Sequence, residues 1–153
     1  MTCKDEYQDL FKTVMKEHLA VFEAQNVAEL EQFMDLIVKA DRIFCMGVGR
    51  EGISTRGFAM RLMHLGKEVH WIWDDTTPGM HKGDLFIATN GSGKIGHIQY
   101  VTEQAKKSGA TVAIVTGSAN QVNREFADFV LFVPASVFNG TDTRAVESIQ
   151  PMG

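Results

Sequence analysis

The residues of this sequence that could do chemistry are gathered in three short loops rich in glycine, hydroxyl and basic side chains. They read Gly47-x-Gly49-Arg50, Asn90-Gly91-Ser92-Gly93-Lys94 and Thr116-Gly117-Ser118. Glycine lets a backbone approach a ligand closely, and the N–H groups at the start of a helix bind anions. The loops therefore predict a phosphate-binding pocket and leave open which phosphate compound it accepts.

The second loop resembles the ATP-binding P-loop only in part. That motif, G-x-x-x-x-G-K-[ST], requires a glycine five residues before Gly93, where this chain has Ala88. It also requires a hydroxyl residue after the lysine to bind Mg²⁺, and this chain has Ile95 there. Because both positions fail and the loop is too short to wrap a triphosphate, ATP hydrolysis is not expected.

The first loop satisfies the dinucleotide-binding pattern G-x-G-x-x-G at residues 47–52. The pair Asp74-Asp75 follows the next expected strand, where an acid could bind a ribose hydroxyl. However, the bulky and charged Glu51 would lie close to the pyrophosphate, and the chain offers no second lobe to position a hydride acceptor. An NAD-dependent oxidoreductase is therefore a less favoured hypothesis than a protein that binds another phosphate compound.

The composition excludes several classes of function. The 153 residues suit one domain, and a net charge of −4 gives no electrostatic basis for binding nucleic acid. No apolar stretch approaches the length of a membrane span, and no apolar segment near the start indicates a signal peptide. Cys3 and Cys45 lack metal-binding spacing, and Asp74-Asp75 lacks a third ligand. We expect a cytoplasmic protein without a metal.

The elements that must position the loops follow from the spacing of apolar residues. Residues 4–22 and 27–38 carry apolar side chains every three or four positions, which predicts two amphipathic helices that form a hairpin over 1–40. The pair Asn26 and Glu29 resembles a capping box at the start of the second helix.

Strands and helices then alternate over 41–135. Strands are expected at 42–49, 67–73, 83–93, 110–118 and 128–134, and helices at 51–66, 94–109 and 120–127. Unbroken apolar strands alternating with helices predict a doubly wound α/β sandwich with a parallel sheet. Ligands of such sheets bind beyond the carboxyl ends of the strands, where all three loops fall.

Several stretches resemble the sugar isomerase (SIS) domain family, and most closely the 6-phospho-3-hexuloisomerases, over roughly residues 27–153. They are the glycine motif at 47–52, FAMRLMHLG at 58–66, TTP at 76–78, GDL at 83–85, GSG at 91–93 and SIQPMG at 148–153. FAMRLMHLG and QPMG are the specific parts, because the whole superfamily shares the glycine loops.

The resemblance implies a single SIS domain with a flavodoxin-like, five-stranded parallel sheet and neither metal nor organic cofactor. It implies a homodimer or homotetramer whose active sites use neighbouring subunits. It also implies isomerisation of a phosphorylated sugar, from hexulose 6-phosphate to fructose 6-phosphate, by enediol proton transfer. The alternative is a non-catalytic sugar-phosphate-binding module, as SIS domains in regulators are.

Departures from the family pattern fall on the loops. Glu51 replaces a usual serine, Asn90 and Ile95 replace hydroxyl residues, and Lys94 replaces an acid and adds a positive charge. Glu51 either opposes a phosphate by charge repulsion or pairs with Lys94. The family's chain continues past QPMG into a helix with a glutamate proposed as the base, so segment 136–153 is either truncated or its acid comes from elsewhere.

Enediol chemistry requires a group that takes and returns a proton and a means of holding an oxyanion. The candidates for proton transfer are His64, His81, Glu51 and Glu147. Each residue also has a purely structural explanation. His64 could pack in a helix and His81 could be a solvated loop residue. Glu51 could simply favour the helix dipole, and Glu147 could be an exposed surface acid. The sequence does not choose among them.

Self-association is predicted because the helices carry more apolar surface than one small domain would bury. The stripe from Tyr7 to Phe22 is long for a hairpin, and the helix at 51–65 is apolar on two sides. Such surfaces are typical of contacts between subunits, so we expect at least a dimer.

Overall fold

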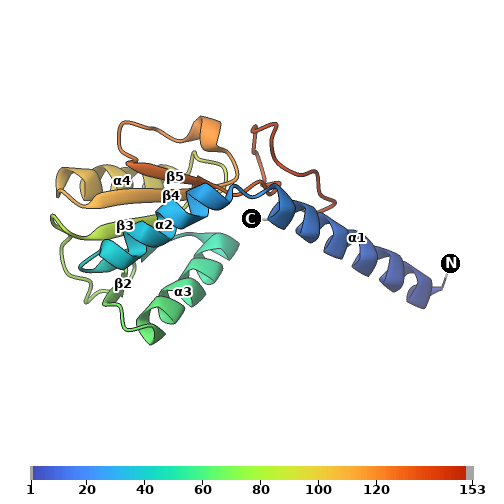
Figure 1. Ribbon diagram of the computed structural model, residues 1–153, viewed down its shortest axis with the longest axis horizontal. Helices are drawn as coiled ribbons and strands as arrows, with labels where there is room; N and C mark the ends of the chain where they lie inside the picture. The colour runs from blue at the N-terminus through green and yellow to red at the C-terminus, as the bar shows by residue number, and fades with distance from the viewer. Residues whose placement is uncertain (1, 151–153) are drawn as a thin grey trace.

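The computed structural model describes residues 2–150 and contains one five-stranded sheet in the order β2-β1-β3-β4-β5 (Figure 1). Every neighbouring pair of strands is parallel. The strands are β1 (Ile43–Met46), β2 (Val69–Trp71), β3 (Leu85–Thr89), β4 (Thr111–Thr116) and β5 (Phe129–Phe132). Because all strands point the same way, their carboxyl ends lie at one edge of the sheet.

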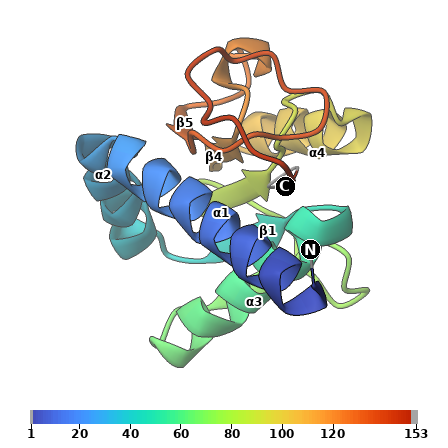
Figure 2. The ribbon, with the colours of Figure 1, turned by 90° about the vertical axis from the view of Figure 1, so that its right-hand side faces the viewer.

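Helices cover both faces of the sheet, which confirms the predicted doubly wound α/β class (Figures 1 and 2). One face packs against α2 (Val27–Lys39) and α3 (Gly49–His64). The other packs against α4 (Gly96–Lys107) and the short 3-10 helix η1 (Ala119–Gln121). Within residues 2–150, no helix combines the length and the apolar character that crossing a bilayer requires.

Each strand is a continuous run of mostly apolar residues because both faces of the sheet are buried. In β1, Ile43 and Cys45 pack toward α2 and α3, whereas Phe44 and Met46 pack toward α4. All four side chains are fully buried, and each large one contributes roughly 1.5–3 kcal/mol of transfer free energy. Burial also raises the pKa of the Cys45 thiol to about 12, so it packs as a small apolar group.

The helix α1 (Cys3–Ala24) leaves the body of the protein and does not lie alongside α2 (Figure 1). Both helices of the expected hairpin are present, but Gln25 and Asn26 between them have extended backbones, so the chain does not turn back. The Glu17 carboxylate accepts hydrogen bonds from the Ser148 hydroxyl at 2.6 Å and the Ile149 N–H at 3.0 Å. The C-terminal segment thereby holds the inner part of α1.

An ion pair with a buried carboxylate joins the residues that precede β1 and β3 at the amino edge of the sheet, opposite the loops. Arg42 donates to both carboxylate oxygens of Asp84, at 3.0 and 2.6 Å, and the Asp84 side chain has no exposed area. Burial alone would raise the pKa of Asp84, but the hydrogen bonds from Arg42 and from the His81 N–H outweigh it and lower that pKa.

The prediction of a helix at 120–127 is wrong beyond the first turn. Only Ala119–Gln121 form a 3-10 helix, and the following residues are turns. The Asn123 side chain accepts a hydrogen bond from the Glu125 N–H at 3.0 Å. Such local bonds from asparagine compete with helical hydrogen bonds, which explains why the helix stops here.

Candidate functional site

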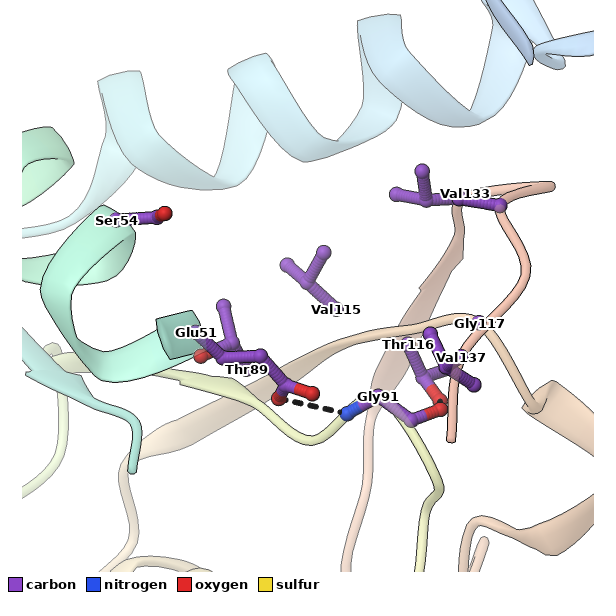
Figure 3. A pocket seen from close by; sticks show the side chains of 10 residues that line it. Glu51, Ser54, Thr89, Gly91, Val115, Thr116, Gly117, Val133 and Val137 are labelled. Carbon is purple, nitrogen blue, oxygen red and sulfur yellow. Dashed lines mark hydrogen bonds between the residues drawn. The ribbon is translucent and has the colours of Figure 1, made fainter. Parts of the chain in front are cut away.

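Three strand-end loops converge on one pocket of about 160 Å³ at the carboxyl edge of the sheet (Figure 3). The strands β1, β3 and β4 are neighbours, so the loops that follow them lie side by side. The pocket is lined by Glu51 from α3, Gly91 after β3, Gly117 after β4 and Val137 beyond β5. The predicted meeting of the loops is therefore present in the structure.

The glycines of the first loop serve the packing of α3 against β1. A Cβ atom on Gly52 would lie 2.8 Å from the carbonyl carbon and oxygen of Gly47, so only glycine allows this approach. Gly49 has a φ of 57°, which favours glycine. The Trp73 indole N–H donates to the Gly47 carbonyl at 3.3 Å. The G-x-G-x-x-G spacing thus has a structural cause that involves no dinucleotide. Gly49 and Arg50 are exposed, and neither of them lines this pocket.

The second loop is closed by its own hydrogen bonds. The buried Asn90 accepts from the Gly93 N–H through its carbonyl at 2.9 Å and from the Ile95 N–H through its side chain at 3.3 Å. The Ser92 hydroxyl accepts from the Lys94 N–H at 3.4 Å. Asn90 therefore shapes the loop, whereas the half-buried Ser92 and the exposed Lys94 lie nearer to solvent.

The third loop is tied to the second by its hydroxyl groups. The Thr116 hydroxyl donates to the Gly91 carbonyl at 3.1 Å and accepts from the Ser118 N–H at 3.0 Å. The Ser118 hydroxyl accepts from the Thr141 N–H at 3.3 Å. Both side chains are buried, so these two predicted substrate-binding residues already make contacts that hold the loops together.

Glu51 makes the contact that links the first and second loops. Its Oε2 accepts a hydrogen bond from the Gly91 N–H at 2.8 Å (Figure 3). The sequence left open whether Glu51 pairs with Lys94. Among the ion pairs of residues 2–150, none joins these two side chains, and the contact to the Gly91 amide takes its place.

The remaining candidates for proton transfer lie in different places. His64 ends α3 and His81 precedes β3, so both lie at the amino edge of the sheet, away from the loops of their own chain. His81 instead contacts Arg42, whose Nη2 lies 2.6 Å from the histidine Nε2. Glu147 is exposed and lines a second hollow of about 340 Å³, which shares the residues Gly117 and Val137 with the first.

The chain resembles known isomerases over most of its length. It is 37% identical to the 3-hexulose-6-phosphate isomerase of Mycobacterium gastri, over 87% of this chain and 61% of that protein. It is 34% identical to the 3-hexulose-6-phosphate isomerase of Bacillus subtilis, over 82% of this chain and 67% of that protein. The chain belongs to the 3-hexulose-6-phosphate isomerase family.

A solved structure agrees with this membership. The protein MJ1247 of Methanococcus jannaschii, for which a function of 3-hexulose-6-phosphate isomerase was inferred, has a TM-score of 0.73 and 31% identity. The match covers 84% of this chain and 74% of that one. No protein-family model matches the chain. The chain spans about three fifths of the length of the curated relatives it matches.

One wall of the site in this 3-hexulose-6-phosphate isomerase family member was missed by the sequence reasoning. The segment after β5 returns over the loops, and a Cβ atom on Gly117 would lie 2.7 Å from Val137. Its signal in the sequence is the pair Asn139-Gly140, since this dipeptide marks a tight turn and Asn139 has a φ of 59°. That turn brings Thr141 back to the third loop.

Both acids of the Asp74-Asp75 pair are exposed. Asp74 lies 3.5 Å from Arg56 in an exposed ion pair. Over residues 2–150, no group of three or more histidine, cysteine, aspartate or glutamate side chains could hold a metal ion.

Proposed function

We propose that this chain is a phosphosugar isomerase that interconverts a hexulose 6-phosphate and fructose 6-phosphate through an enediol. The observation that carries the proposal is the convergence of three strand-end loops on one pocket, in a chain of this family. Isomerisation moves a proton between adjacent carbons, so it needs an acid–base group and a firm hold on the phosphate.

The phosphate is assigned to the rim of the second loop. Ser92 and Lys94 lie between β3 and the start of α4, where helix N–H groups and the helix dipole favour an anion. A serine hydroxyl can donate to a phosphate oxygen while it accepts from an amide, and a lysine side chain supplies a compact positive charge. Arg50, which is exposed in the first turn of α3, can add a second positive charge.

Proton transfer is assigned to Glu147. A sugar held by its phosphate at the second loop extends its carbon chain past Gly117 and Val137 into the second hollow, and Glu147 lines that hollow. Glu51 is the other acid at the pocket, but its carboxylate is bonded to the Gly91 amide. His64 and His81 would require a neighbouring subunit to reach these loops.

The direct test is turnover of the phosphorylated ketose. Purified protein mixed with 3-hexulose 6-phosphate should form fructose 6-phosphate, measured by chromatography, whereas the unphosphorylated hexulose should remain unchanged. Saturating fructose 6-phosphate should also raise the melting temperature, because a ligand that binds only the folded state stabilises it. Stabilisation without turnover would favour the non-catalytic sensor. The absence of both turnover and stabilisation would contradict the proposal.

We also propose that the chain self-associates through α1. None of the 22 residues of this helix is buried, although one side of it is apolar. The exposed apolar side chains of this stripe are Tyr7, Leu10, Phe11, Met15, Leu19 and Phe22. A further apolar surface lies on α3, where Ile53 is 76% exposed. Surfaces of this kind are covered by a second copy in homo-oligomers.

A charge in this stripe should dissociate the oligomer. Light scattering should give the wild type at least twice the chain mass of 17.0 kDa, and Phe11→Asp should shift it toward one chain mass. The reason is that burying an unpaired carboxylate in an apolar contact costs several kcal/mol. The control is Lys16→Asp on the polar side of α1, which should keep the wild-type mass. A wild type that is monomeric at micromolar concentration would exclude this interface.

A further inference from the structure

The Glu51 carboxylate occupies the backbone amide of Gly91, next to the proposed phosphate site at Ser92 and Lys94. Its Oε2 accepts from the Gly91 N–H at 2.8 Å, and its side chain lines the pocket (Figure 3). A Cβ atom placed on Gly91 would collide with the other oxygen of this carboxylate. Both carboxylate oxygens therefore lie close to Gly91.

The Gly91 amide differs from the amides of the residues at 93–95 that follow it. The N–H groups of Gly93, Lys94 and Ile95 donate to acceptors within the loop at 2.9 to 3.4 Å. The Gly91 N–H instead donates to a charged side chain that comes from a different element, 40 residues earlier in the chain. An outside anion can take this amide by displacing one side chain, without opening the loop.

The charge of Glu51 and the charge of a phosphate group are in direct conflict here. A phosphate oxygen at the Gly91 amide would have to replace the Glu51 oxygen, and the two anions would repel at close range. Repulsion is stronger in the pocket than in water, because its walls of valine, alanine and glycine lower the local dielectric. The two groups cannot occupy this amide together.

We propose that the Glu51 carboxylate is a built-in competitor of the substrate phosphate for the Gly91 amide. Binding of a phosphorylated sugar then requires Glu51 to release this amide, which lowers the affinity for every phosphorylated ligand. A sugar without phosphate does not meet this competition. The inference rests on the proposed function and deepens it, since it names the residue that sets the affinity for phosphate.

The test removes the charge of Glu51 and keeps the shape of its side chain. Dissociation constants of wild type and Glu51→Gln are measured by calorimetry with inorganic phosphate, fructose 6-phosphate and fructose. For Glu51→Gln, the dissociation constants of the two phosphate compounds should fall about tenfold or more, while that of fructose stays unchanged. Glu51→Ser, which removes the carboxylate altogether, should act in the same direction. The control Glu125→Gln neutralises an exposed acid outside the pocket and should change nothing.

Two results would overturn the inference. Glu51→Gln and Glu51→Ser would bind phosphate compounds no more tightly than wild type if the carboxylate does not compete. An equal gain for fructose would mean that the variants enlarge the pocket and do not relieve a charge conflict. Failure of the proposed function looks different: wild type and variants would all leave 3-hexulose 6-phosphate unconverted, while titration with inorganic phosphate would still measure the competition.

Discussion

Replacing Glu147 with glutamine is expected to lower the kcat of hexulose 6-phosphate isomerisation by about 10²- to 10⁴-fold, the usual contribution of a general acid–base group. Glutamine keeps the size of the side chain but cannot take a proton. The KM should stay within a few-fold of the wild-type value, because the phosphate is held at the second loop and not by Glu147. Steady-state kinetics in both directions measure this separation of kcat from KM.

The control for Glu147→Gln is again Glu125→Gln, which removes an exposed acid that lines neither hollow and should leave both constants unchanged. Far-ultraviolet circular dichroism and the melting temperature should match the wild type, since the Glu147 side chain is exposed. A kcat that falls less than threefold would rule out Glu147 as the proton-transfer group. A rise in KM with unchanged kcat would make Glu147 a binding residue.

Replacing Arg42 with alanine is expected to destabilise the fold by about 3–5 kcal/mol, because it leaves a buried carboxylate without its partner. The Asp84 side chain has no exposed area and accepts two hydrogen bonds from Arg42. Arg42 also stacks on Phe44, with its guanidinium carbon 5.1 Å from the ring centre. At this chain length, the melting temperature should fall by roughly 10 °C or more, measured by calorimetry.

The exposed ion pair between Lys39 and Asp35 is a matched control. Its side chains are 74% and 70% exposed, and such pairs contribute at most about 1 kcal/mol. Lys39→Ala should therefore barely change the melting temperature. Adding Asp84→Asn to Arg42→Ala should recover part of the loss, because the buried charge disappears. If Arg42→Ala alone melts within 2 °C of the wild type, an uncompensated buried charge is not the mechanism.

The positions of His64 and His81 at the amino edge follow from the topology of the sheet and not from the sequence motifs around them. A helix that starts at the carboxyl edge runs back over the sheet, and the 16 residues of α3 carry His64 to the opposite edge. His81 lies four residues before the start of β3, which begins at the amino edge. Both positions could be derived from the expected strand order. The motif that contains His64 gave no indication of this separation.

The sequence alone determined the parallel sheet, its covered faces and the edge at which the glycine loops meet. These features depend on local signals, because apolar runs specify buried strands and glycines end them at fixed points. The tertiary structure decided which polar groups are already engaged. Thr116 and Ser118 tie the loops together. Glu51 accepts a hydrogen bond from the amide of Gly91, which lies 40 residues later in the chain. Hydrogen-bond partners distant in the sequence are set by how the elements pack, so residue type and spacing alone could not reveal them.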